Sequence, residues 1–247
     1  MLPKDRLLAV TAALSGEKVP QLWRMNPDGS ARTRLTKERQ PCRQPRWSGD
    51  GTRITYATVT GTDPASGEEI LTWWRCIPDG TGRTKAPAPS TSIPLSKLEI
   101  IENGGLVTGF RTPGGPLRKL TLSPAAEKFW DETGISGGAL RLVELPGTSA
   151  YLLAVQLAGG NREGKWHTAV KVELATGNAE PWGQYGFSGF STSPDSRQFV
   201  TCFNRMADGK EEHALYLGSM ADPRKLRRIL TSPEMVFADW CGGKRVV

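Results

Sequence analysis

Short runs rich in β-branched residues, separated by tight polar turns, recur along the chain. In Gln44–Tyr56, a strand pattern is followed by the turn Gly49–Gly51 and a second strand pattern. Gly189–Thr201 has the same organisation, with its turn at Pro194–Ser196. Asp-Gly and Gly-Gly pairs supply the positive φ that a two-residue hairpin turn requires. The pattern therefore predicts antiparallel β-hairpins.

Three further segments carry the same hairpin pattern. Ala238–Val247 turns at its Gly-Gly pair, and Leu140–Val155 turns at Pro146-Gly147. The weakest copy is Lys97–Phe110, which turns at Asn103-Gly104. Because missing a repeat would assign the wrong fold, this recurrence decides the fold prediction.

A second kind of hairpin follows each of the first kind. Gln21–Thr36 matches Thr72–Lys85, since both contain Trp-Arg followed by Pro-Asp-Gly. Val170–Trp182 aligns with Lys119–Trp130, and Ala214–Thr231 completes the set. Two hairpins make a unit of about four strands that recurs at roughly 45–50 residues, the range of propeller blades.

The repeat predicts an all-β chain folded as a single β-propeller of five four-stranded antiparallel blades. The chain begins with a second strand, Leu7–Leu14, and ends with a first strand, Val236–Trp240, followed by the start of a second at Arg245–Val247. We expect the two ends to share one blade, because this pairing removes exposed sheet edges. A six-blade ring with a degenerate unit near 90–135 is the alternative. Within the single domain 1–247, the predicted blades are 235–247 plus 1–43, 44–92, 93–137, 138–185 and 186–234.

Two stretches resemble a known family. The sequences of Trp47–Ile54 and Leu22–Ser30 look like the repeats of TolB-like β-propellers, which are relatives of WD-type propellers. Arg34–Thr36 and Ile229–Thr231 resemble the blade-ending strand of that family. The matching residues are turn and core positions, so the resemblance is specific for the fold. It implies a non-catalytic binding platform, often extracytoplasmic, or a domain fused to a peptidase.

Composition agrees with a turn-rich globular protein. The 28 Gly and 18 Pro are too many for a helical bundle, and 38% hydrophobic residues with eight Trp exclude a disordered chain. No apolar run approaches the ~20 residues of a transmembrane helix. The resemblance implies a periplasmic or other extracytoplasmic location, whereas the absence of a signal peptide favours the cytoplasm.

The cysteines and oligomeric state are left open by the sequence. Cys42, Cys76, Cys202 and Cys241 show no CxxC pairing and no metal-ligand spacing. They neither require nor exclude disulfides.

Candidate catalytic and metal motifs are weak, and we predict no enzyme, cofactor or metal site. Gly134–Gly138 matches the Gly-x-Ser-x-Gly nucleophile elbow, with Asp195 and His213 in hydrolase order, but a strand is predicted where the motif needs a helix. Neither His213 nor His167 has a second ligand at metal spacing. Turn chemistry explains the four Asp-Gly pairs, and Gly80–Lys85 lacks the P-loop spacing.

Basic and aromatic residues are the candidate binding groups. One basic cluster lies on a predicted fourth strand and its exit loop, and a second lies on the fourth strand of the last complete blade. Both could share one sector of the outer rim, either as a solvated edge that discourages strand addition or as a binding face. Trp73 and Trp74 point to opposite faces of their strand, so one of them faces either a neighbouring blade or a partner protein. The candidate residues are Arg32, Arg34, Lys37, Arg39, Arg43, Arg46, Trp73, Trp74, Arg224, Lys225, Arg227 and Arg228.

These features predict a non-catalytic propeller that acts as a scaffold or docks onto other proteins, as a peripheral subunit of a larger, membrane-associated complex. The net charge of +7 favours an acidic protein or an anionic membrane surface as the partner. Nucleic acid ranks last, because no strand combines aromatic and basic residues as an RNP motif does. The alternatives are binding of a small ligand or glycan in the central channel, and a targeting domain related to those of propeller-fused peptidases.

Overall fold

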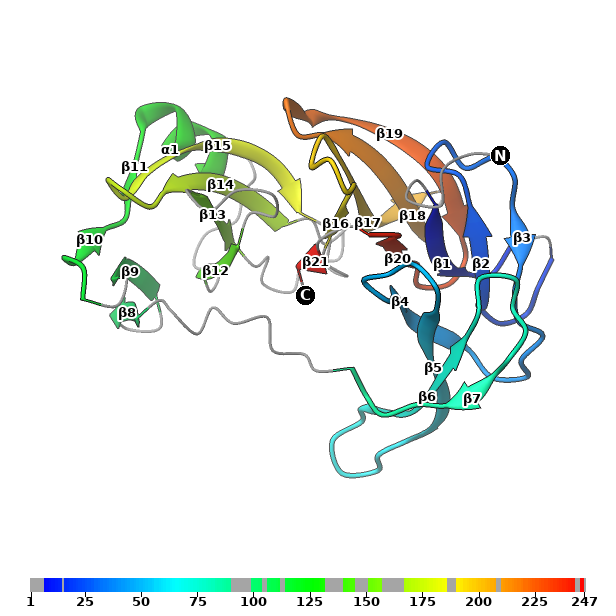
Figure 1. Cartoon of the computed structure of the whole chain (residues 1–247). Helices are drawn as coiled ribbons and strands as arrows, with labels where there is room; N and C mark the ends of the chain where they lie inside the picture. Colours follow the sequence, from blue (N-terminus) through cyan, green and yellow to red (C-terminus); the bar gives the residue numbers. More distant parts are fainter. Residues whose placement is uncertain are drawn as a thin grey trace.

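The computed structural model describes residues 7–14, 16–89, 99–103, 106–111, 114–131, 140–144, 151–156, 167–185, 190–207, 210–242 and 245–246. Strands dominate this part of the chain, and they form five sheets, which we name A to E. Figure 1 shows the sheets following one another in the order C, D, E, A, B around a centre where β16, β20 and β21 lie. The prediction of an all-β, propeller-type chain is confirmed at this level.

Hydrogen bonding between neighbouring strands defines the order of strands within each sheet. Sheet A contains β20 (Phe237–Trp240), β1 (Leu8–Ala12), β2 (Gln21–Met25) and β3 (Thr33–Arg34) in that order. Sheet B contains β4 (Cys42–Trp47), β5 (Ile54–Thr62), β6 (Glu69–Cys76) and β7 (Thr84–Lys85). Sheet C contains β10 (Arg118–Lys119), β9 (Leu106–Arg111) and β8 (Glu99–Asn103).

Sheets D and E have five strands each among the described residues. Sheet D contains β11 (Thr121–Leu122), β15 (Asn178–Tyr185), β14 (His167–Glu173), β13 (Tyr151–Gln156) and β12 (Leu140–Glu144). Sheet E contains β19 (Asp222–Ser232), β18 (Lys210–Ser219), β17 (Gln198–Ala207), β16 (Phe190–Thr192) and β21 (Arg245–Val246).

Strands from the two ends of the chain pair in sheet A. β20 runs antiparallel to β1, with Leu8 opposite Trp240 and Thr11 opposite Phe237. The expectation that β20 and β1 share a sheet is therefore confirmed. The final strand, β21, does not join sheet A as expected. It pairs with β16 in sheet E, so that Arg245 lies opposite Ser191. The segment after the Gly-Gly turn thus extends the neighbouring sheet instead of starting a second strand of sheet A.

The segment predicted to match Val170–Trp182 contains a helix, α1 (Pro124–Asp131), so the strand prediction for Lys119–Trp130 is wrong there. Ser123 caps this helix, because its Oγ accepts the Ala126 N–H at 3.1 Å. Pro124 follows at the first helical position, where its missing N–H costs nothing. The preceding residues form the short strand β11, which pairs in parallel with β15.

The core lies between neighbouring sheets. Leu8 and Val10 of β1 pack in a cluster with Leu217 and Ile229 of sheet E. The intervening Ala9 packs with residues of sheet B instead. Because successive strand residues point to opposite faces, burial of both faces explains why β1 is apolar at nearly every position.

The four cysteines are free thiols, and all are buried. Cys42 and Cys76 belong to the cluster between sheets A and B. Burial raises the pKa of each of these two thiols to about 11. They therefore pack as small, protonated apolar groups.

The first-hairpin turns of sheets B and E repeat at atomic detail. In sheet B, the Ser48 N–H donates to the Arg53 carbonyl at 2.9 Å, and the Ser48 hydroxyl donates to Asp50 at 2.6 Å. In sheet E, Ser193 makes both bonds at the same lengths to the corresponding residues. The sequence repeat is therefore also a repeat of hydrogen bonding.

Acidification is expected to test the Asp50 turn. Hydrogen bonds from Ser48 and Thr52 lower the pKa of Asp50 to about 2. A depressed folded-state pKa gives stability that is present above the unfolded value near 3.8 and is lost as the pH falls through about 2. Asp50→Asn should therefore lower the melting temperature at pH 5, with the difference shrinking as the pH approaches 2. Glu68→Gln, an exposed carboxylate that accepts no hydrogen bond among the described residues, is the control; a constant Asp50→Asn difference across this range would contradict the prediction.

The Pro-Asp-Gly turns of sheets A and B press against the preceding sheet. Gly29 and Gly80 have φ values of 86° and 90°. A Cβ atom on Gly29 would lie 2.9 Å from the Ile229 carbonyl oxygen of sheet E, and one on Gly80 would lie 2.6 Å from that of Leu35 in sheet A. These positions need glycine both for its backbone conformation and for close approach to the neighbouring sheet.

Gly80→Ala is expected to lower the free energy of unfolding by about 2–3 kcal/mol, because φ strain and a backbone clash add. Gly67→Ala is the matched control, since Gly67 has a φ of 73° and nothing within 4 Å of its added Cβ. It should cost about 1 kcal/mol. Urea unfolding of both variants measures the difference, and equal losses would show that the contact with Leu35 does not matter.

Candidate interaction surface

Basic side chains gather on β19, an edge strand of sheet E. The exposed members are Arg224, Lys225, Arg227 and Arg228. Lys225 lies 2.9 Å from Asp222, and Arg228 lies 3.8 Å from Glu212. Arg224 and Arg227 have no carboxylate within ion-pair distance among the described residues. Arg227 nevertheless lies near enough to Asp28 to help lower the pKa of that carboxyl.

Arg32 of sheet A reaches the same edge. Its Nε donates to the Gly29 carbonyl at 2.7 Å, and its Nη2 donates to the Ile229 carbonyl of β19 at 3.4 Å. No carboxylate pairs with this guanidinium group in the described part of the chain. The structure thus brings Arg32 to the second predicted cluster, and we call Arg32, Arg224 and Arg227 the basic strip.

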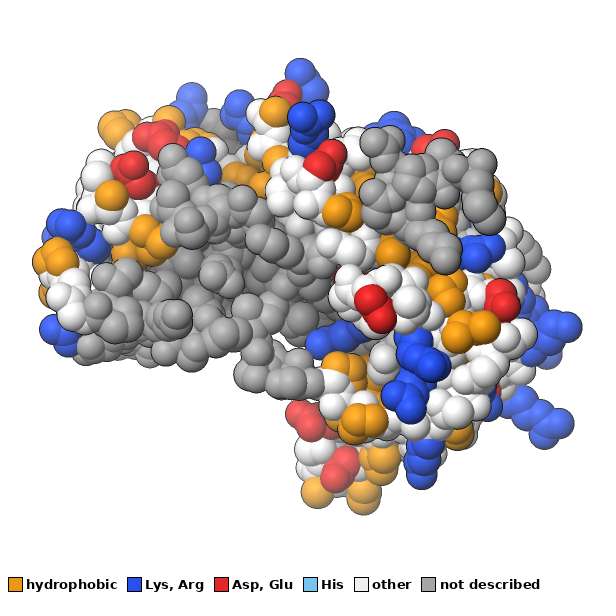
Figure 2. Space-filling model, in the orientation of Figure 1, with side chains coloured by type: hydrophobic (Ala, Val, Ile, Leu, Met, Phe, Trp, Pro, Cys, Tyr) orange, Lys and Arg blue, Asp and Glu red, His pale blue; other side chains and the backbone are white. Residues whose placement is uncertain are grey.

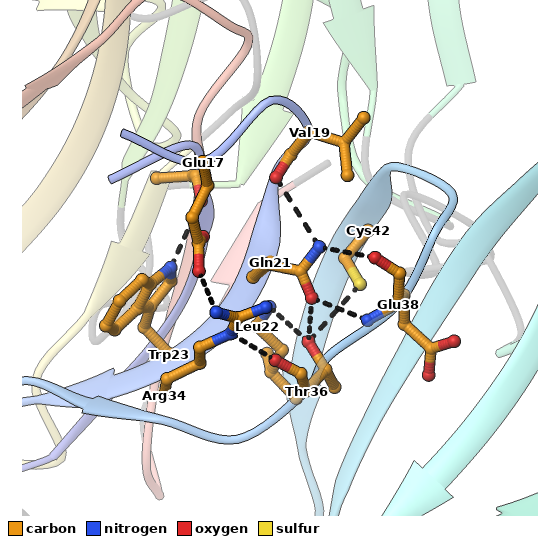
Figure 3. A network of polar contacts seen from close by, with 10 residues as sticks. Glu17, Val19, Gln21, Leu22, Trp23, Arg34, Thr36, Glu38 and Cys42 are labelled. Atoms are coloured by element: carbon orange, nitrogen blue, oxygen red, sulfur yellow. Dashed lines mark hydrogen bonds and ion pairs between the residues drawn. The ribbon is translucent and has the colours of Figure 1, made fainter. Parts of the chain in front are cut away.

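The other basic residues of the first predicted cluster differ in whether their charge is exposed or paired within the protein. Lys37 and Arg39 are exposed beyond the end of β3. Arg34 forms an ion pair with Glu17 and donates its Nε to the Thr36 carbonyl at 2.6 Å (Figure 3). Burial raises the pKa of Glu17, and Arg34 partly offsets this effect. The charge of Arg34 is therefore compensated within the protein.

Arg43 and Arg46 lie on β4, the inner strand of sheet B, so their assignment to the outer rim is wrong. The strand begins two residues earlier than the repeat suggested, and it takes in what was expected to be an exit loop. Arg43 is only 8% exposed, and its Nη2 lies 3.2 Å from Glu69. Neither residue belongs to the basic strip.

Trp73 and Trp74 are both half-buried on β6. Trp74 packs against the cluster between sheets A and B, and its Nε1–H donates to Thr58 at 3.0 Å. The Arg83 guanidinium carbon lies 3.6 Å from the centre of its ring, a cation–π contact. Trp74 is thus used within the fold, and Trp73 points to the opposite face of sheet B.

A buried amide fixes the path of the chain from sheet A to sheet B. Gln21 accepts the Thr36 hydroxyl at 3.0 Å and the Glu38 N–H at 2.8 Å, and its amide donates to the Glu38 carbonyl at 2.9 Å (Figure 3). The side chain therefore replaces the strand pairing that the backbone loses where β3 ends. This network is structural, and it holds Lys37 and Arg39 on an ordered connection.

The inner strands of sheets E, A and B are linked by Asp239, which is 6% exposed. Its carboxylate accepts the Trp47 N–H of β4 at 2.8 Å and the Ser191 hydroxyl of β16 at 2.9 Å. Ser191 in turn accepts the Trp240 N–H at 2.9 Å. The Trp47 and Trp240 N–H groups thus each bond to a side chain of the neighbouring sheet, Asp239 of sheet A and Ser191 of sheet E.

A cleft of about 610 Å³ opens between sheets E and A, beside the basic strip. Its walls come from the Pro27–Asp28 turn of sheet A and the Pro194–Asp195 turn of sheet E. Trp240 and Leu217 contribute apolar lining, and Arg227 belongs to both the cleft and the basic strip. No pattern along the sequence pointed to this cleft.

The cleft carries charges of both signs. Asp28 and Asp195 lie on one turn each, and Arg197 lies near the start of β17. Hydrogen bonds from Ser30 lower the pKa of Asp28, with a smaller contribution from Arg227. Asp28 is therefore ionised at neutral pH.

The residues of the candidate catalytic and metal motifs do not come together as a site in the described part of the chain. Gly134–Gly138 lies outside them. His213 is buried on β18, 9% exposed, and Asp195 accepts the hydroxyl of Ser193 in a turn. The described ranges contain no group of three or more His, Cys, Asp or Glu residues placed to hold a metal ion. Within the same ranges, no helix has the length and hydropathy of a membrane span.

Basic side chains are spread over the visible face of the molecule. Figure 2 shows Lys and Arg at the right, over sheets A and B, and at the top, above β19, with fewer acidic side chains among them. The net charge of +7 is thus spread over the surface of several sheets.

No protein-family model matches the chain, and no curated protein sequence matches it significantly. Among solved structures, the chain is similar to TolB from Acinetobacter baumannii, with a TM-score of 0.50 and 14% identity over 96% of this chain and 66% of that one. It is also similar to a TolB-type protein from Agrobacterium tumefaciens, with a TM-score of 0.41 and 10% identity over 98% and 99% of the two chains. The tricorn protease matches with a TM-score of 0.33 and 10% identity over 89% of this chain and 25% of that one.

The likeness to the Acinetobacter protein carries the fold argument, and identities this low bear on the fold alone. This chain spans 66% of that protein's length. The sequence resemblance, the repeated hairpin turns and the sheet order agree with this match. The chain has a TolB-like β-propeller fold.

Proposed function

We propose that this protein is a non-catalytic β-propeller that binds another protein through the basic strip where sheets E and A meet. In this proposal, the five sheets are the blades of one ring, in which the pairing of β20 with β1 joins strands from the two ends of the chain. The setting is a larger, membrane-associated complex in which the disc is a peripheral subunit.

The observation that carries the proposal is a set of exposed guanidinium groups that form no ion pair in the described part of the chain. Arg32, Arg224 and Arg227 are exposed, come from two adjoining sheets and have no carboxylate within ion-pair distance in the described part of the chain. Such a patch attracts an acidic surface and raises the rate of encounter. Arginine is also enriched at the centres of protein interfaces.

Protection of the β19 edge is the competing explanation, because charged side chains discourage strand addition whichever sign they have. The variant Arg32→Glu/Arg224→Glu/Arg227→Glu separates the two explanations. It keeps the edge charged but reverses the sign that a partner would meet. Edge protection predicts no change in binding, and docking predicts a loss.

Native-source affinity purification with and without about 0.5 M NaCl tests the proposal, since surface electrostatics weaken in salt. We expect the wild type to recover a protein partner at low salt and the reversed variant to recover much less. The control is Arg53→Glu/Arg75→Glu/Lys85→Glu, which makes the same change in charge at exposed residues of sheet B. Recovery of the wild type alone at both salt concentrations would refute the proposal.

A further inference from the structure

The cleft between sheets E and A is a better-defined feature than the basic strip beside it. Its volume of about 610 Å³ lies within the range of ligand pockets. The lining runs from Ser193, at the end of β16, to Arg227 on β19. These strands are separated by three strand spacings, so the cleft is about 14 Å long, which equals roughly four extended residues.

Several hydrogen-bond donors line the cleft. Trp240 is 2% exposed, and its buried Nε1–H has no acceptor among the described residues. A buried unsatisfied donor is costly. The guanidinium groups of Arg197 and Arg227 likewise have no ion-pair partner in the described ranges. The cleft therefore offers several donors to acceptor atoms.

The acidic residues of the cleft limit the kind of ligand. Asp28 and Asp195 lie on the two opposing turns. A phosphate or another purely anionic group would be repelled by both carboxylates. An extended peptide main chain instead supplies a carbonyl acceptor and an N–H donor at every residue, which suits a cleft that has both arginines and aspartates.

We propose that this cleft binds an extended peptide segment of a protein partner, with the peptide main chain between the two turns and acidic peptide side chains directed to the basic strip. The inference rests on the proposed function, which it deepens by naming the part of the partner that is recognised. Arg227 joins the two surfaces, since it lines the cleft and belongs to the strip.

Selection from a display library of random peptides of about twelve residues tests the inference, because such peptides exceed the length of the cleft. We expect acidic peptides to be enriched, and their affinities to be measurable by fluorescence polarisation. Ser219→Trp, which fills the cleft, and Arg227→Gln should each weaken binding about tenfold or more. Arg228→Gln, on the opposite face of the same strand, should change it less than about twofold. Melting temperatures of all three variants establish that they fold.

Several outcomes would overturn the inference. These are failure to enrich any peptide, equal binding by the wild type and Ser219→Trp, and displacement of the peptide by inorganic phosphate at constant ionic strength. The last result would identify an anion site. Ser219→Trp leaves the basic strip intact, so partner recovery that persists without peptide enrichment removes the cleft inference alone. Enriched peptides that bind the cleft, together with partner recovery unaffected by reversal of the strip, would remove the proposed function alone.

Discussion

Asp239→Ala is expected to lower the free energy of unfolding by about 3 kcal/mol, because it leaves two donors unsatisfied. The carboxylate accepts the Trp47 N–H from sheet B and the Ser191 hydroxyl from sheet E. Both donors would lose their acceptor in a region where Asp239 itself is 6% exposed. The effect should be large because one side chain connects the inner strands of three sheets.

Two milder variants make this prediction specific. Ser191→Ala removes one donor to Asp239 and the acceptor of the Trp240 N–H, and should cost about 1–2 kcal/mol. Asp239→Asn keeps an acceptor of similar shape and should lie between the wild type and Asp239→Ala. Urea unfolding and a double-mutant cycle between positions 191 and 239 measure the coupling. Additive effects of the two alanine variants would contradict the link between sheets E and A.

Reversing the basic strip is expected to reduce the association rate with the recovered partner about a hundredfold at low ionic strength. Arg32 bonds to the main chain of β19, the strand that carries Arg227, so one acidic surface can meet both of these residues. The difference from the wild type should shrink as salt is added, because exposed charges are screened beyond about 10 Å at 0.1 M.

Surface plasmon resonance over a series of NaCl concentrations provides the measurement. The control with Arg53, Arg75 and Lys85 reversed should associate at nearly the wild-type rate. An equal reduction in both variants would show that net charge, and not the basic strip, governs binding. A change confined to the dissociation rate would argue against electrostatic steering.

Local repeats were predictable because consecutive residues determine the conformation of a tight turn. The Ser48–Arg53 turn and its counterpart at Ser193 were visible as matching sequence, and the same hydrogen bonds appear in both. The pairing of β20 with β1 was predictable because Val236–Trp240 and Leu7–Leu14 match the first and second strands of one repeat. Helix α1 has a local signal, because Ser123-Pro124 is a typical N-terminal capping pair. The repeat pattern nevertheless predicted strands for this segment.

The functional surface was less predictable because its parts come from distant segments. Arg32 and Ile229 are 197 residues apart, and no local pattern reports their contact. The cleft likewise needs turns from two sheets to face each other. The charges of Arg43 and Arg46 suggested the outer rim, but the start of β4 at Cys42 places both residues on an inner strand. Asp239 did leave a signal, as a carboxylate inside the otherwise apolar strand Val236–Trp240.

Cross-linking mass spectrometry of the protein with its recovered partner tests the central claim, docking at the edge where sheets E and A meet, most directly. With an amine-reactive reagent, we predict cross-links from Lys225, which is 87% exposed beside the basic strip, and from Lys37 beyond β3. Lys119 and Lys128, near sheets C and D, should give none. Cross-links to the partner from Lys119 and Lys128, with none from Lys225, would contradict docking at this edge.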